Sequence, residues 1–202
     1  MEAAGALSRP VDVFLATLAS SAPAPGGGAA AALCGAMAAG LVAMVSRVTT
    51  EREPSTRDEV SPVTARADHL QHRLAALVEE DMAAYRGVIE SRASGPAALQ
   101  QALRRAIDAP LDVVRLGREV LGLCETLAPR ARRSAISDLG VAAALAWGAL
   151  ESGALTARVN LTASSDTEFV RATAREVEQL TSEGAAARQR ASSVVTRRIE
   201  SD

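Results

Sequence analysis

The residue best suited to acid–base chemistry is Asp81, which interrupts an apolar series on one predicted helix. That series contains Leu70, Leu74 and Leu77. Asp81 and Tyr85 continue it in steps of three or four, so both lie on the face that the leucines bury. A buried carboxylate is costly unless it is paired or used, and burial raises its pKa towards the range of proton transfer. We therefore predict that Asp81 transfers protons; the alternative is a structural carboxylate bonded to a helix end or an arginine.

A second candidate site is the turn formed by Pro25, Gly26, Gly27 and Gly28. The proline fixes its own backbone, whereas glycines permit left-handed dihedral angles and the close approach of another backbone or a ligand. Strong helix formers follow at once, and no residue of the segment 29–45 is charged. The turn should therefore lie at a helix N-terminus, whose unpaired N–H groups and partial positive charge favour a carboxylate or another anion.

Asp138 and Asn160 are weaker candidates. Asp138 follows Ser137 at the predicted start of a helix, where an acidic residue favours the helix dipole whatever its function. Asn160 lies between apolar neighbours, where its amide needs hydrogen-bond partners. If one unbroken helix joins them, the two residues are about 33 Å apart along its axis. They would then share a pocket only through a second subunit or a break in the helix.

Other catalytic chemistries find little support in the sequence. The chain contains no lysine, which excludes a Schiff base or a lysine general base. His69 and His72 have a spacing that metal ligands use, but only Asp68 is near them, so we expect no bound metal. Cys34 and Cys124 are far apart in the sequence and should be buried free thiols in a reducing compartment.

The pattern of apolar residues predicts an all-α protein. We expect a single domain over residues 1–202, a bundle of about seven helices around an Ala/Gly-rich central helix. Prolines and glycines define the breaks, and the segment 51–62, with two prolines and six charged residues, should be an exposed loop. The expected helices cover residues 11–20, 29–49, 62–94, 97–107, 108–128, 137 to at least 150 with 159 as the further limit, and 166–199.

The overall composition excludes several classes of partner. At 202 residues the chain is long enough to bury a core, and its net charge of −2 gives no reason to expect nucleic acid. The apolar run 29–45 is at the short limit for crossing a membrane, and alanine adds little transfer energy. No signal peptide is visible, so we expect a cytoplasmic protein without a membrane anchor.

The motifs together resemble those of the cyclodeaminase/cyclohydrolase family. This family comprises the folate-processing domain of formiminotransferase-cyclodeaminase and the stand-alone methenyltetrahydrofolate cyclohydrolases. The most specific match is PAPGGGAAAALCGAMAAGLVAMVSRVT over 23–49. Three further matches follow in the family's order: EDMAAY over 80–85, APLDVV over 109–114, and ISDLGVAA over 136–143 with VNL over 159–161.

The resemblance implies an all-helical homodimer that binds a reduced folate near the glycine turn. No permanently bound cofactor is implied, since the tetrahydrofolate derivative is the substrate. The activity would be formimidoyltetrahydrofolate cyclodeaminase, an ammonia-lyase, or methenyltetrahydrofolate cyclohydrolase, and the sequence does not choose between them. The catalytic residues would be Asp81, its hydrogen-bonding partner Tyr85, and Asp138. Substrate would be bound by Pro25, Gly26, Gly27, Gly28, Arg47 and Asn160.

Two segments depart from the family's pattern. TTEREPSTR over 49–57 replaces a segment that often contains lysine, and RARR over 130–133 replaces one that often contains Gly-Asn. If those positions contact substrate, these differences affect specificity or activity. The alternative to an enzyme is therefore a helical dimer that has kept the scaffold and serves as a binding or assembly module.

Overall fold

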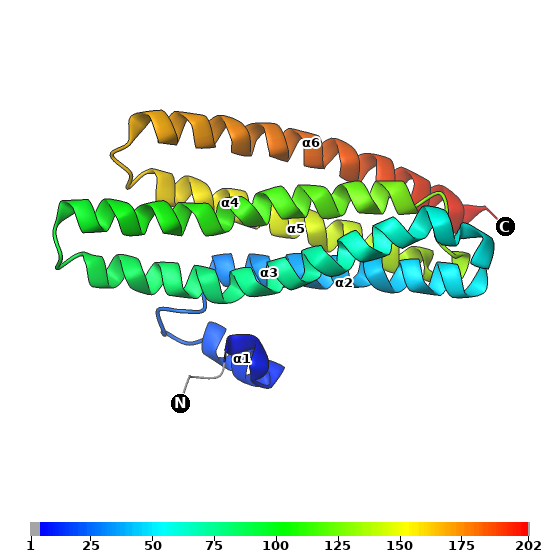
Figure 1. Cartoon of the computed structure of the whole chain (residues 1–202), viewed down its shortest axis with the longest axis horizontal. Helices are drawn as coiled ribbons and strands as arrows, with labels where there is room; N and C mark the ends of the chain where they lie inside the picture. The colour runs from blue at the N-terminus through cyan, green and yellow to red at the C-terminus, as the bar shows by residue number, and fades with distance from the viewer. Residues whose placement is uncertain (1–4, 202) are drawn as a thin grey trace.

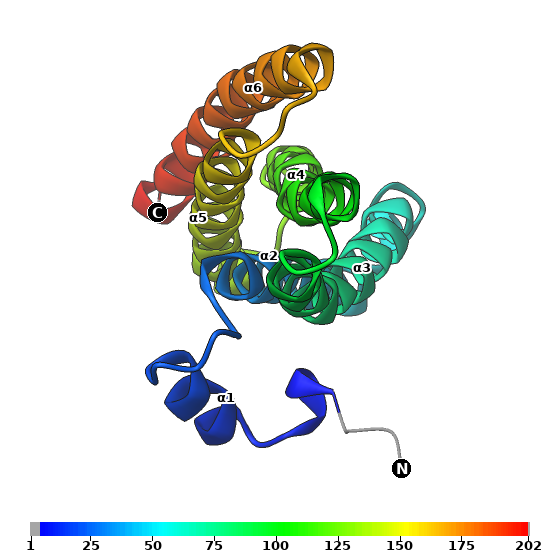
Figure 2. The same cartoon turned by 90° about the vertical axis from the view of Figure 1, so that its left-hand side faces the viewer.

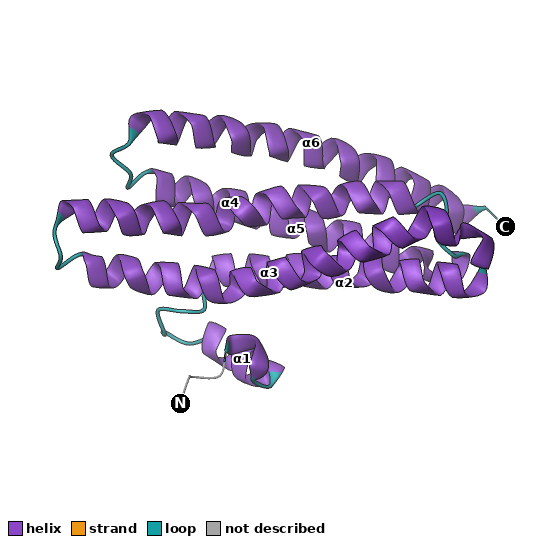
Figure 3. Ribbon diagram, viewed as in Figure 1, coloured by secondary structure: helices purple, strands orange, loops and turns teal. Residues whose placement is uncertain are grey.

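The protein is an all-helical bundle, as the sequence predicts (Figures 1 and 3). The computed structural model describes residues 5–201, which contain six α-helices and no strand. The prediction of about seven helices is therefore wrong by one. The helices are α1 (Val11–Leu18), α2 (Gly27–Arg52), α3 (Arg57–Ser91), α4 (Pro96–Leu127), α5 (Ile136–Leu161) and α6 (Thr167–Glu200).

Two prolines that were expected to begin helices instead lie inside them. Pro110 lies within α4, so the two helices expected over 97–128 are one. Pro62 lies within α3, so most of the exposed loop expected over 51–62 is helical, apart from a 3₁₀ turn at Pro54–Thr56. A proline in a helix removes one backbone hydrogen bond, so the freed carbonyl group needs another donor.

The helices α2 to α6 run alternately in opposite directions and pack side by side (Figures 1 and 2). α2 packs mainly against α3 and α5 and also contacts α4. α4 in turn contacts α2, α3, α5 and α6. The Ala/Gly-rich α2 is thus a core helix, but it shares the centre with α4, and one side of it, at Met37, is exposed.

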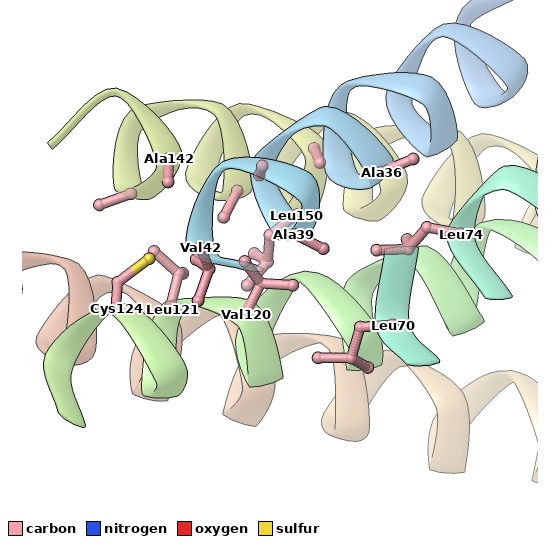
Figure 4. Close-up of a cluster of buried hydrophobic side chains, with 14 of the residues drawn as sticks. Ala36, Ala39, Val42, Leu70, Leu74, Val120, Leu121, Cys124, Ala142 and Leu150 are labelled. Carbon is pink, nitrogen blue, oxygen red and sulfur yellow. The ribbon is translucent and has the colours of Figure 1, made fainter. Parts of the chain in front are cut away.

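Small residues bring the central helices close together (Figure 4). A Cβ atom added to Gly35 of α2 would lie 3.0 Å from the Leu74 side chain and 3.4 Å from Ala149. A Cβ atom added to Gly153 of α5 would lie 3.0 Å from the carbonyl oxygen of Pro110. Contacts of this kind explain why alanine and glycine dominate α2 and α5, since larger residues would push the helices apart.

The segment before α2 projects from the bundle. α1 lies beyond α2 in both views (Figures 1 and 2), and Phe14 attaches it to the core. The opposite side of α1 is open, since Val11 is 71% exposed and Leu15 55%. The cis peptide bond between Ala24 and Pro25 lies in the connection to α2.

Two stretches are long and apolar enough to cross a membrane by length and composition, Gly27–Arg52 and Arg133–Leu161. Both lie in the bundle, where 61% of the most apolar window of the first and 44% of that of the second are buried. Some of their exposed residues are apolar, among them Met37, Leu155 and Val159.

Candidate active site

One cavity contains most of the residues singled out from the sequence. It has a volume of about 560 Å³ and lies where α2 begins and where α3 and α5 approach their ends. Its predicted members are Gly26, Gly27, Gly28, Asp81, Tyr85 and Asn160. Segments more than 130 residues apart in the chain thus meet at one end of the bundle, as the resemblance implied.

The central contact in this cavity joins Asp81 of α3 to the first turn of α2. The N-cap residue of α2 is Gly26, which has no side chain to cap the helix and precedes it in an extended conformation. The Asp81 carboxylate occupies this end of the helix instead, within reach of the backbone N–H of Ala29. Free N–H groups and the helix dipole both favour a negative charge there.

Gly28 is required for this contact. A Cβ atom at Gly28 would lie 2.8 Å from Oδ2 of Asp81 and closer still to its Cγ and Oδ1. Among the described residues only Gly95 has a positive φ, so Gly26–Gly28 do not use the left-handed dihedral angles that glycine permits. These glycines provide space: the carboxylate approaches α2 where a larger residue would exclude it.

Two opposing effects set the acidity of Asp81. Burial raises its pKa above the ordinary value, and the backbone N–H of Ala29 partly opposes the rise by stabilising the carboxylate. The net effect is an increase. Asp81 therefore holds its proton more tightly than an exposed aspartate, which brings its pKa closer to the range useful for exchanging protons with nitrogen and water.

Tyr85 lines the same cavity but is not buried. It is 48% exposed, and no hydrogen bond joins it to Asp81 in the described part of the chain. The prediction that the leucine face buries Tyr85 is therefore wrong. Val78 is the last buried residue of α3, so Tyr85 continues the apolar face of the helix beyond the part that the neighbouring helices bury. Tyr85 is thus accessible to a molecule that enters the cavity.

Asn160 is held by a hydrogen bond to a backbone carbonyl group of α4 that Pro110 leaves without a donor. Its Nδ2 donates to the carbonyl oxygen of Ala106 at 2.6 Å. In a regular helix that carbonyl accepts from the N–H four residues later, at position 110, where proline has none. Asn160 therefore supplies the donor that α4 lacks and is fixed beside the cavity. Its Oδ1 accepts no hydrogen bond within residues 5–201.

Three predicted site residues lie outside this cavity. Pro25 is buried beside it and lines a smaller neighbouring cavity of about 270 Å³. Arg47 lies near the other end of α2 and donates to Asp68, with an Nη2–Oδ2 distance of 2.7 Å. Asp138 is in the first turn of α5, which is unbroken to Leu161, so it lies about 33 Å from Asn160.

Sequence reasoning missed other residues that line the cavity, among them Arg92 and Thr156. Arg92 follows the end of α3 and is exposed. It brings a positive charge to the cavity, but neither residue stands out from its neighbours in the sequence. The link between Pro110 and Ala106 was visible in principle, since a proline in a helix identifies the carbonyl it leaves free.

Comparison with known proteins agrees with the motifs. A family model described as formiminotransferase-cyclodeaminase matches residues 10–179, which include every predicted site residue. The chain belongs to this family.

Two proteins are similar to this cyclodeaminase-family chain over most of its length. A methenyltetrahydrofolate cyclohydrolase of Methylorubrum extorquens is 36% identical over 192 residues, which cover 89% of this chain and 92% of the relative. The crystal structure of a formiminotetrahydrofolate cyclodeaminase from Thermotoga maritima superimposes with a TM-score of 0.91. That protein is 26% identical, and the match covers 96% of this chain and 98% of the other.

The packing of Gly28 against Asp81 predicts a coupling between the two residues. Gly28→Ala should lower the free energy of unfolding by about 1–3 kcal/mol, because the methyl group overlaps the carboxylate. In an Asp81→Ala background the same change should cost less, because the overlapping group is gone. Gly87→Ala, at a helical glycine with open space around it, is the matched control and should stabilise the protein. Equal costs of Gly28→Ala in both backgrounds, measured by urea unfolding, would contradict the contact.

The raised pKa of Asp81 predicts a pH-dependent penalty on folding. The folded chain binds this proton more tightly than the unfolded chain. The free energy of unfolding therefore falls as the pH rises from about 3.8 through the folded pKa, and the penalty persists at neutral pH. Asp81→Asn should be more stable than the wild type at pH 7, by roughly 2–4 °C in Tm for each 1 kcal/mol. The difference should shrink below about pH 3.8. Glu90→Gln, at an exposed residue of α3, is the control for the loss of one negative charge in the same thermal scans.

Proposed function

We propose that the chain is a folate-dependent enzyme of one-carbon metabolism, and first a methenyltetrahydrofolate cyclohydrolase. The observation that carries this proposal is the half-buried Asp81 carboxylate at the glycine-rich start of α2, in a family whose named relatives act on folates. The full-length relative at 36% identity favours the cyclohydrolase. The Thermotoga maritima neighbour makes the cyclodeaminase the second candidate. A scaffold without activity is disfavoured, because Asp81, Gly28 and Asn160 remain together.

Asp81 fits the proton transfers of the cyclohydrolase reaction. Water adds to the carbon that bridges N5 and N10 and loses a proton, giving a tetrahedral carbon. The bond from this carbon to N5 then breaks and N5 takes a proton. The hydroxyl group gives its own proton to solvent as it becomes the formyl carbonyl of 10-formyltetrahydrofolate. A carboxyl group with a raised pKa accepts the first proton and returns it to N5. Tyr85 and Asn160 would hold the substrate, with Asn160 Oδ1 as acceptor.

In the cyclodeaminase reaction Asp81 would first donate a proton, whereas in the cyclohydrolase reaction it would first accept one. N10 of 5-formimidoyltetrahydrofolate attacks the formimidoyl carbon, and the proton of N10 passes to the imino nitrogen. The resulting amino group leaves as ammonia after it takes one further proton. Asp81 in its protonated form supplies that proton, which the raised pKa makes available nearer to neutral pH. In both reactions the folate is the substrate, and the proposal includes no permanently bound cofactor. We place the enzyme in the cytoplasm, where reduced folates would reach it without a membrane anchor.

We further propose that the enzyme is a homodimer. Its α2/α5 face, defined by Cys34, Met37, Leu41 and Met44 of α2 and Val141, Gly148, Leu155 and Val159 of α5, is partly or fully exposed and mostly apolar, with Glu151 and Ser152 between Gly148 and Leu155. The Cys34 thiol donates to the carbonyl oxygen of Leu145 at 3.3 Å, so the two helices are adjacent along it. Leu155 is 63% exposed and Val159 68%. An apolar surface that spans two long helices is typical of a subunit interface.

The activity is tested with the purified chain and two substrates. Loss of the bridge absorbance of 5,10-methenyltetrahydrofolate reports the cyclohydrolase, and ammonia release from the formimidoyl substrate reports the cyclodeaminase. Asp81→Asn should reduce turnover by about 10²–10⁴-fold, because it removes the proton-transfer group and keeps its shape. If the wild type turns over neither substrate and binds no folate by calorimetry, the enzymatic proposal fails. Full turnover by Asp81→Asn would instead refute the role of that residue.

The dimer is tested by sedimentation. The wild type should sediment at twice the chain mass of 20.8 kDa. Leu155→Glu places a charge on the α2/α5 face and should shift the mass towards that of a single chain. Ile199→Glu, at an equally apolar exposed residue near the end of α6, is the matched control and should leave the mass unchanged. A wild-type protein that sediments as a single chain would contradict the proposal.

A further inference from the structure

A second large hollow, the α5/α6 groove, lies between α5 and α6, which pack side by side (Figure 2). It has a volume of about 770 Å³ and shares no lining residue with the cavity at the start of α2. Trp147 of α5 forms one wall, and the other lining residues come from α6, between Ala185 and Arg197. Trp147 is about 100° around α5 from Gly148. The groove therefore lies on a different side of α5 from the α2/α5 face.

Trp147 presents an indole ring that is held in place but only half-buried. A Cβ atom added to Gly184 of α6 would lie 3.6 Å from Cζ3 of Trp147, so the backbone of α6 packs against one edge of the ring. The guanidinium carbon of Arg188 lies 5.5 Å from the centroid of the indole. Where Arg104 stacks on Phe169, the corresponding distance is only 3.6 Å. A small movement of the Arg188 side chain can therefore admit a planar ring between its guanidinium group and the indole.

The α5/α6 groove is positively charged. No carboxylate is among its described lining residues, and Arg188 and Arg197 are not paired with a carboxylate within residues 5–201. Nε of Arg197 donates to the carbonyl oxygen of Ser193 at 3.3 Å, which leaves its Nη groups for a ligand. By contrast, Arg190 of the same helix is paired with Glu125 of α4. The two arginines in the groove thus keep their charge available for an anion.

Neutral hydrogen-bonding groups lie between the two arginines. Gln189, Ser192 and Thr196 line the groove, and their side chains make no hydrogen bond with residues 5–201. They follow one another in steps of three or four and therefore form one row along α6. Arg188 and Arg197, at the two ends of this row, are about 13 Å apart along the helix axis. The groove thus offers an aromatic plane at one end, hydroxyl and amide groups in the middle, and a cation at the other end.

We propose that the α5/α6 groove binds a nucleoside polyphosphate. The base lies between the indole of Trp147 and the guanidinium group of Arg188, where both of its faces are stacked. The sugar hydroxyl groups lie along the row of neutral side chains, and the last phosphates reach Arg197, whose planar donors match phosphate oxygens. The length of a nucleoside triphosphate suits the separation of the two arginines. This site goes beyond the proposed folate activity, because it uses no residue of the candidate active site.

The fluorescence of Trp147 tests this site directly, because Trp147 is the only tryptophan of the chain. ATP without magnesium, at constant ionic strength and with excitation above the adenine absorption band, should quench it with half-saturation below about 1 mM. Adenosine lacks the phosphates and tripolyphosphate lacks the base, so calorimetry should show that each binds at least about tenfold more weakly than ATP. No saturable quenching by ATP would overturn the proposal. Tripolyphosphate that binds as tightly as ATP would also overturn it, because the groove would then be a site for anions alone.

Substitutions of single arginines separate the two ends of the groove. Arg197→Gln should weaken the binding of ATP by about ten- to hundredfold and leave that of adenosine unchanged, because it removes only the phosphate contacts. Arg188→Gln should weaken the binding of both, because this side chain covers the base.

Arg171→Gln is the matched control, since it removes the same charge from an exposed residue near the start of α6. It should change the affinity for ATP by less than about twofold. Equal losses in Arg171→Gln and Arg197→Gln would show attraction by the overall charge and would overturn the proposal. Thermal unfolding of each variant confirms that it is folded, and no outcome depends on whether the chain turns over a folate.

Discussion

The candidate site depends on one contact, in which a carboxylate from α3 occupies the N-terminus of α2. Asp81 approaches the helix because Gly28 has no side chain, and its position near Ala29 replaces the cap that the turn lacks. The same burial that lets Asp81 stabilise the helix end raises its pKa. Asp81 can therefore bind the helix end and transfer protons, so the two interpretations of this residue from the sequence do not exclude each other.

The site also depends on a hydrogen bond between α5 and α4. Pro110 frees the carbonyl group of Ala106, and Asn160 supplies the missing donor at 2.6 Å. The hydrogen bond lets a proline lie within a continuous helix, and it fixes the amide at the edge of the cavity. The close approach of α4 and α5 at Gly153 keeps these groups in register. Asn160 therefore contributes to the fold and to the site through the same side chain.

Local patterns predicted most of the helices and the glycine turn at a helix start, and the family resemblance placed Asp81 and this turn in one site. These patterns failed where contacts with residues far away in the sequence determine whether a helix continues or a side chain is buried. Pro110 does not break α4, because its repair comes from Asn160 in another helix. Tyr85 follows the buried periodicity of α3, yet it lies beyond the part that the bundle covers. Asp138 matches the family's motif, but the unbroken α5 places it at the far end of the bundle. Periodicity defines the faces of helices and does not define where the neighbouring helices end.

The most direct test of this account is an NMR titration of the Asp81 side-chain carboxyl carbon in the wild-type protein, with Asp81→Asn used to assign the signal. The account predicts a titration midpoint above the ordinary value of 3.8, because burial outweighs the N–H group of Ala29. A midpoint at or below 3.8 would show that the carboxylate is solvated or strongly paired, and it would contradict the central claim.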